Sequence, residues 1–181
     1  MTYALIGDSQ GVGVASSLAS LLPVVFSEPH SGWTTARLVR DGPLERALAS
    51  GADKLIVVTG GNDDPLSRAA FGELVSRARA ARVELLVVGP VFARTDDAAR
   101  HDAARAQLEA AARDAGVRFL DAYPLTRDLA STANVHLTAT RYRTYAERIA
   151  SAVRGAGASG ASAIVGVALA LGLGWLLLRG R

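Results

Sequence analysis

The 181-residue sequence predicts an α/β fold with three layers, α/β/α, built on a five-stranded parallel sheet, plus a C-terminal transmembrane helix. Short apolar runs rich in Val, Leu and Ile recur without alternating with polar residues, which is typical of strands buried on both faces of a parallel sheet. Segments with helical periodicity separate these runs, and this alternation indicates a doubly wound sheet. A long uncharged run near the C-terminus predicts the membrane helix.

The α/β domain is predicted to span residues 1–154. Five strands are expected over residues 3–6, 23–26, 54–58, 83–88 and 117–120. Four helices are expected over residues 13–21, 65–81, 96–115 and 138–153. We expect Pro65 in the first turn of its helix, Gly116 at the end of the third helix and Thr138 at the start of the last.

The C-terminal part has a different composition. Residues 155–160 are small and predict a flexible linker, whereas residues 161–178 carry no charge. As a helix this run would be about 27 Å long, close to the roughly 30 Å hydrocarbon core of a bilayer. Trp175 and the basic tail of residues 179–181 fit a membrane interface. Small residues at every fourth position could support self-association into a homo-oligomer: Ser162, Gly166, Ala170 and Gly174.

No signal peptide is recognisable at the N-terminus, so we expect the domain to stay on the side of the membrane where it is made. Its C-terminal helix is expected to tether it to a cellular or virion membrane. The absence of cysteine excludes disulfides and thiolate catalysis. The net charge of +3 comes mostly from dispersed arginines without interleaved aromatics, so nucleic-acid binding is not expected. Histidines and carboxylates do not cluster at ligand spacings, so neither a metal nor another cofactor is expected.

Polar residues gather in the turns that follow the first three strands, over residues 7–11, 30–35 and 60–63. The carboxyl ends of parallel strands meet at one edge of the sheet, where ligands bind. Ser9 lies between a strand and a helix, which exposes its hydroxyl near the positive end of the helix dipole. Serine needs a base within hydrogen-bond reach, and His136 is the histidine placed in another loop with that capacity.

The order of four sequence blocks resembles the SGNH (GDSL-like) hydrolase superfamily: Gly7-Asp8-Ser9, then Gly32, then Gly60-Gly61-Asn62-Asp63, then His136 within Val-His-Leu-Thr. The resemblance covers essentially residues 1–154. It implies the flavodoxin-like SGNH fold and serine esterase or acetylesterase activity. It also implies Ser9 as nucleophile, His136 as general base, and an oxyanion hole formed by the backbone N–H groups of Ser9 and Gly32 with the Asn62 side chain.

One position departs from the family pattern. The family usually has an aspartate three residues before the histidine, where this chain has Ala133. Asn134 is adjacent but neutral, and Asp121 at the end of the fifth strand is another conceivable carboxylate. We expect Asp8 and Asp63 to shape the loops by hydrogen bonding.

Three other residues near the site or on a helix have weaker expectations. We expect His30 to line the pocket or cap a turn, and His101 to be solvated on a charged helix. Trp33 is expected either to line a substrate pocket or to pack against a helix.

Two functional hypotheses follow. The first is a membrane-anchored serine hydrolase that cleaves a short-acyl or acetyl ester, with an acylated glycan or a small lipid ester as substrate. The alternative is a catalytically impaired SGNH-fold protein that serves binding or assembly at the membrane, which the Ala133 departure and the small-residue face both motivate.

Overall fold

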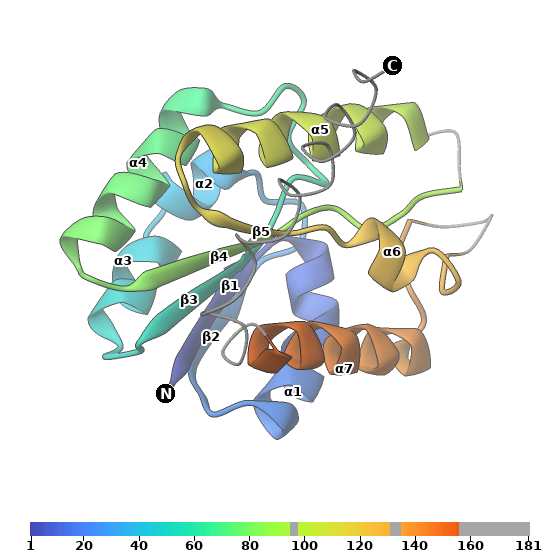
Figure 1. The fold of residues 1–181 in the computed structure, drawn as a ribbon, viewed down its shortest axis with the longest axis horizontal. Coiled ribbons are helices and arrows are strands. Elements are labelled where there is room, and N and C mark those ends of the chain that lie inside the picture. The colour runs from blue at the N-terminus through green and yellow to red at the C-terminus, as the bar shows by residue number, and fades with distance from the viewer. Residues whose placement is uncertain (95–97, 131–134, 156–181) are drawn as a thin grey trace, which may run out of the picture.

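Five parallel strands form the central sheet, in the order β2-β1-β3-β4-β5 (Figure 1). The computed structural model describes residues 1–94, 98–130 and 135–155. The strands are β1 (Tyr3–Gly7), β2 (Val24–Pro29), β3 (Lys54–Val58), β4 (Glu84–Val88) and β5 (Arg118–Leu120). All five predicted strands and their parallel pairing are therefore confirmed, although β2 continues three residues further than predicted.

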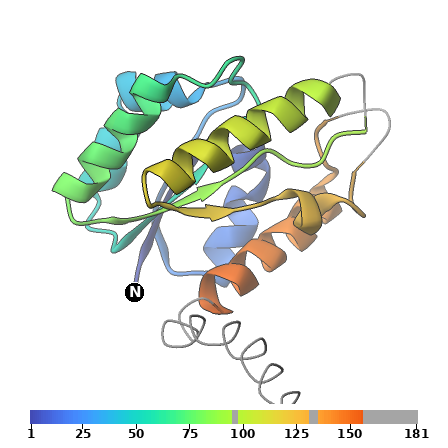
Figure 2. The same cartoon turned by 45° about the horizontal axis from the view of Figure 1, so that its top comes forward.

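Helices cover both faces of the sheet (Figures 1 and 2). One face carries α1 (Ser9–Leu21), α6 (Tyr123–Thr126) and α7 (Ala139–Gly155). The other carries α2 (Thr35–Arg40), α3 (Pro43–Ala49), α4 (Arg68–Ala80) and α5 (Ala98–Asp114). This is the predicted three-layer α/β/α arrangement.

Each inner strand supplies side chains to two separate hydrophobic cores. In β1, Leu5 packs into the core beneath α1 and α7, whereas Ala4 and Ile6 pack into the core beneath α2–α5. All three side chains are fully buried. Successive side chains of a strand point to opposite faces, so a strand covered on both faces needs an unbroken apolar run. Fully burying one such large side chain contributes about 1.5–3 kcal/mol.

The helix boundaries correct several predictions. Helix α1 begins at Ser9 and not at residue 13, because the Asp8 side chain accepts a hydrogen bond from the Gln10 N–H and caps the helix. Helix α4 begins at Arg68, after the Ser67 cap, so Pro65 precedes the helix instead of occupying its first turn. Helices α2, α3 and α6 were not predicted. Gly116 was predicted to end the helix before it. It follows α5 with a φ of +60°, a left-handed conformation that is common just after the end of a helix.

Most of the predicted C-terminal region lies beyond Gly155, the last described residue. Helix α7 runs to Gly155, one residue into the predicted linker. Among the helices of residues 1–94, 98–130 and 135–155, none combines the length and apolar character needed to cross a bilayer. The predicted membrane helix over residues 161–178, its small-residue face and its basic tail lie outside the described residues.

Candidate active site

Those predicted site residues that follow strands β1, β2 and β3 lie at the C-terminal edge of the sheet. Backbone hydrogen bonds join the ends of adjacent strands there. The N–H of Asp8 donates to the carbonyl oxygen of Val58 (2.9 Å), and the N–H of His30 donates to that of Gly7 (2.8 Å). These contacts continue the parallel ladder past β1, so the loops after β1, β2 and β3 leave the sheet side by side.

Ser9 and His136 form a hydrogen bond of 2.9 Å between Ser9 Oγ and His136 Nε2. Ser9 is half-buried at the first position of α1, and His136 is exposed in the loop before α7. The two helices pack against the same face of the sheet, which brings together residues far apart in sequence. A nucleophile and its base must approach within about 2.6–3.2 Å, so this pair has the geometry for proton transfer from serine.

Asp8 holds the turn that presents Ser9. Its side chain is buried, and its Oδ1 accepts from the N–H of Gln10 at 2.9 Å. Burial raises the pKa of Asp8 to about 7, although the polar backbone groups of Gln10, Gly61 and Gly11 act in the opposite direction. Asp8 therefore shapes the loop, as expected.

Gly32 and Asn62 lie on the neighbouring loops. Gly32 has a φ of +73°, a conformation that favours glycine, and its backbone is exposed. The Asn62 amide donates one hydrogen bond to the carbonyl oxygen of Trp33 at 3.2 Å, which fixes its position relative to the Gly32 loop. The second N–H of an amide of this kind can serve another acceptor. Backbone and amide N–H groups at this edge are the donors that an oxyanion requires.

A buried polar cluster joins the loops after β2 and β3. Asp63 accepts hydrogen bonds from the N–H of Thr35 (3.1 Å) and from its hydroxyl (2.6 Å). The Thr35 hydroxyl lies 2.9 Å from that of Thr59. Burial raises the pKa of Asp63, against the lowering effect of these hydrogen bonds. Sequence reasoning identified Asp63 but missed the two threonines, because their pairing requires two loops to meet in space.

Asp121 and Asn134 are candidate substitutes for the aspartate that the family usually has, and the structure describes only Asp121. Both carboxylate oxygens of Asp121 are engaged by Arg105, at 2.8 and 2.5 Å. Burial alone would raise the pKa of Asp121, but Arg105 and the N–H of Tyr123 bring it below its usual value. Asp121 therefore belongs to an ion pair with α5 and does not orient His136. Ala133 and Asn134 lie outside the described residues.

The remaining histidines have structural contacts. His30 stacks on Trp33 with ring centroids 3.9 Å apart, and its Nε2 lies within hydrogen-bond distance of Glu28 Oε1, at 3.1 Å. Trp33 also packs against the core beneath α2–α5, so the packing alternative is the one observed. His101 is buried, with Nδ1 3.2 Å from the carbonyl oxygen of Val91, so the expectation of a solvated side chain is wrong. Apolar and polar residues are poorly separated along α5, so the sequence did not indicate that His101 lies on its buried face.

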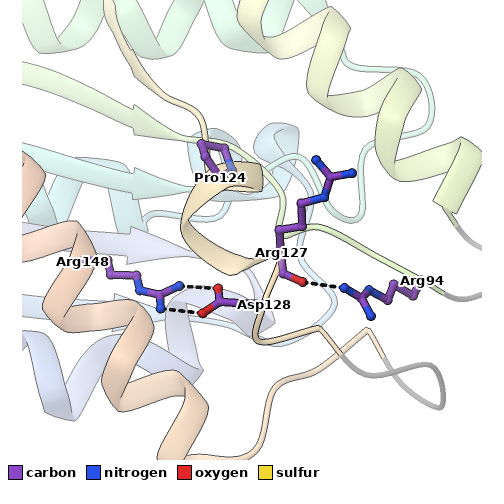
Figure 3. A pocket seen from close by; sticks show the side chains of 5 residues that line it. All are labelled: Arg94, Pro124, Arg127, Asp128 and Arg148. Carbon is purple, nitrogen blue, oxygen red and sulfur yellow. Dashed lines mark hydrogen bonds and ion pairs between the residues drawn. The ribbon is translucent and has the colours of Figure 1, made fainter.

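A hollow of about 490 Å³ beside α6 contains none of the predicted site residues. It is lined by Arg94, Pro124, Arg127, Asp128 and Arg148 (Figure 3). Figure 3 shows Arg148 facing Asp128, with which it makes two hydrogen bonds of 2.6 and 2.7 Å, while the Arg127 side chain points away from both. The basic groups around the hollow do not converge on one point. Within the described ranges, no group of three or more histidines and carboxylates could hold a metal ion.

The chain is similar to known proteins in its sequence pattern and in its fold. The family model of the GDSL-like lipase/acylhydrolase family matches residues 5–144. No curated protein matches the chain in sequence. Solved structures with a similar fold include a GDSL-like lipase from Bacteroides thetaiotaomicron, with a TM-score of 0.67, 15% identity and coverage of 86% of this chain and 88% of that chain.

Two further structures share the fold at comparable distance. The lipase/acylhydrolase from Enterococcus faecalis has a TM-score of 0.57 at 16% identity, covering 86% of this chain and 96% of that chain. An acetylxylan esterase from Geobacillus stearothermophilus has a TM-score of 0.62 at 15% identity, covering 82% of this chain and 91% of that chain. At these identities the solved structures establish only the fold. The family-model match spans most of the chain and therefore establishes the family. This protein belongs to the GDSL-like lipase/acylhydrolase family.

Proposed function

We propose that this chain hydrolyses a carboxylic ester through an acyl-enzyme on Ser9, with His136 as the general base. The observation that carries the proposal is the 2.9 Å hydrogen bond between Ser9 Oγ and His136 Nε2. Family membership supports ester hydrolysis as the class of reaction. Serine alone is a weak nucleophile, and a neighbouring imidazole that accepts its proton removes this limitation.

In the first step, His136 Nε2 accepts the hydroxyl proton while Ser9 Oγ attacks the ester carbonyl carbon. The carbonyl electron pair moves to the oxygen, which accepts hydrogen bonds from the backbone N–H groups of Ser9 and Gly32 and from the Asn62 amide. Collapse of this intermediate expels the alcohol, which takes the proton from His136. Water then attacks the acyl-enzyme, gives a proton to His136 and releases the carboxylic acid; the proton returns to Ser9.

Labelling with a fluorophosphonate probe tests the nucleophile. We expect the wild-type chain to be labelled and Ser9→Ala to be unlabelled. Ser16→Ala is the matched control, because Ser16 lies exposed on the same helix. Equal labelling of the wild type and Ser9→Ala would contradict the proposed nucleophile.

The alternative function is a catalytically impaired binding or assembly protein, and the observation that favours it is Ala133 in place of the usual aspartate. Folded wild-type protein that shows no Ser9-dependent labelling would support this alternative. Loss of the orienting aspartate in a serine protease lowers turnover about 10⁴-fold, so the labelling assay needs long incubation.

We further propose a short acyl group, such as acetyl, carried by a glycan or a small lipid ester. The likeness in fold to an acetylxylan esterase supports this choice. We expect kcat/KM to be higher for p-nitrophenyl acetate than for the octanoate ester. A reversed preference would contradict the short-acyl assignment.

Residues 161–178 are proposed to anchor the chain in a cellular or virion membrane, because the run is uncharged and long enough to span a bilayer. The full chain should float with lipid vesicles. Leu169→Arg with Leu171→Arg should abolish flotation, since each arginine costs about 2.5–3.5 kcal/mol at the centre of a membrane helix. Flotation that survives both substitutions would contradict the anchor.

Self-association through the small-residue face is part of the same proposal. Gly166→Leu with Gly174→Leu should reduce chemical cross-linking of the full chain in detergent, because bulky side chains prevent close approach of two helices. Unchanged cross-linking would exclude this face as the contact.

A further inference from the structure

Gln10 is a buried polar residue immediately after Ser9, and the reaction sequence above does not use it. Its side chain is 3% exposed. Its Nε2 donates to the carbonyl oxygen of Val135 at 3.1 Å, and its Oε1 accepts from the hydroxyl of Tyr142 at 2.9 Å. The amide thus connects the first turn of α1 to the loop before α7 and to α7 itself.

The Val135 carbonyl belongs to the peptide bond that joins Val135 to His136. A hydrogen bond to this carbonyl restrains the backbone from which the imidazole projects. On the other side of His136, the Leu137 side chain is buried in the core beneath α1 and α7. The backbone is therefore held on both sides of a histidine whose own side chain is exposed.

Tyr142 orients the Gln10 amide. Its hydroxyl donates to Oε1, which leaves the amide nitrogen to face Val135. Burial raises the pKa of Tyr142 to about 12, even though the backbone of Leu137 lowers it, so the hydroxyl stays protonated and remains a donor. The amide has a donor and an acceptor in the positions that its two partners require.

We propose that Gln10 is a positioning residue, whose amide, oriented by Tyr142, holds the loop so that His136 Nε2 meets Ser9 Oγ. This inference rests on the proposed function, because it concerns the base of that reaction. The hydrogen bond from Gln10 would also restrain His136 in a chain where alanine occupies position 133, the usual place of the family's aspartate. A displacement of about 1 Å at a reacting group can cost roughly 100-fold in rate.

The first test is Gln10→Met, which keeps the length of the side chain and removes both hydrogen bonds. We expect kcat on p-nitrophenyl acetate to fall about 10- to 100-fold, with KM changed less than about twofold. Gln107→Met is the matched control. Gln107 lies on α5, and its Oε1 accepts a hydrogen bond from the backbone N–H of Leu66, so this variant also removes a hydrogen bond between a glutamine and the backbone. Equal losses in the two variants would overturn the proposal.

A double-mutant cycle with His136→Ala separates positioning from general destabilisation. If Gln10 acts through His136, Gln10→Met should lower the residual rate of His136→Ala less than about twofold. The same fold-loss in both backgrounds would overturn the proposal. Tyr142→Phe provides a second variant, should Gln10→Met unfold; it removes the hydroxyl that orients the amide, and we expect the same direction of change.

A spectroscopic measurement distinguishes failure of this inference from failure of the proposed function. The chain has three histidines, so their ring Cε1–H resonances can be assigned by substitution. In Gln10→Met the His136 resonance should shift or broaden, while those of His30 and His101 stay in place; Gln107→Met should leave His136 unchanged. An unmoved His136 resonance overturns the positioning role, whereas a moved resonance in a chain without Ser9-dependent activity overturns only the hydrolase.

Discussion

Asp63 accepts hydrogen bonds from both the backbone N–H and the hydroxyl of Thr35, and so joins the loop that carries Asn62 to the loop that carries Gly32. Both partners are buried. The two loops contribute the proposed oxyanion donors, so their spacing depends on this contact.

Asp63→Ala should lower the free energy of unfolding by about 1–3 kcal/mol, because it leaves the buried N–H of Thr35 without its acceptor. Urea unfolding measures the change. Asp64→Ala is the control: Asp64 is the exposed neighbour in the same loop, and we expect a change within about 0.5 kcal/mol. Equal effects at the two positions would contradict the assigned role of Asp63.

Asn62→Ala should lower kcat about 10²- to 10³-fold with little change in KM, since an oxyanion donor acts in the transition state and not on bound substrate. Steady-state kinetics on p-nitrophenyl acetate checks this. The Asn62 amide also contacts the Trp33 carbonyl, so urea unfolding of the same variant is needed as a control. A rise in KM at constant kcat would assign Asn62 to substrate binding instead.

Gly13→Ala should destabilise the fold by about 1–3 kcal/mol. A Cβ at this position would lie 2.3 Å from the ring of Tyr142, so α1 and α7 would have to separate. Gly72→Ala is the matched control in α4, where a Cβ meets open space, and we expect about 0.5–1 kcal/mol of stabilisation. Thermal unfolding of both variants gives the comparison. Stabilisation by Gly13→Ala would show that the two helices do not pack this closely.

Asp8→Asn should change how stability depends on pH. Burial raises the folded-state pKa of Asp8 to about 7, above the 3.8 of an exposed aspartate, so the folded state binds more protons between these values. The contribution of Asp8 therefore makes the wild type less stable as the pH rises from about 4 to 7, by at most about 1.4 kcal/mol per unit. Asparagine does not titrate, so Asp8→Asn should show a flatter dependence.

Urea unfolding of both proteins at pH 5 and pH 7 measures this difference. Asp63 also has a pKa raised by burial, but it is present in both proteins, so its contribution cancels in the comparison. Parallel pH dependences would contradict the raised pKa of Asp8.

The sequence by itself determined the strands and the edge of the sheet at which the site lies. Unbroken apolar runs such as residues 55–58 are typical of a strand covered on both faces, and they can be recognised without knowledge of the rest of the fold. Ser9 and His136 were identifiable because a strand-end turn exposes a hydroxyl, and because the chain has few histidines to serve as its base.

Only the tertiary structure decided which side chains meet. The packing of α1 with α7 brings His136 Nε2 to 2.9 Å from Ser9 Oγ, and it places Gln10 between Val135 and Tyr142. Asp121 was a conceivable carboxylate partner for His136 in the sequence, yet Arg105 engages both of its oxygens. Hydrogen bonds act over about 3 Å, whereas the residues they join here lie up to 132 positions apart, and local sequence patterns carry no information about such distances.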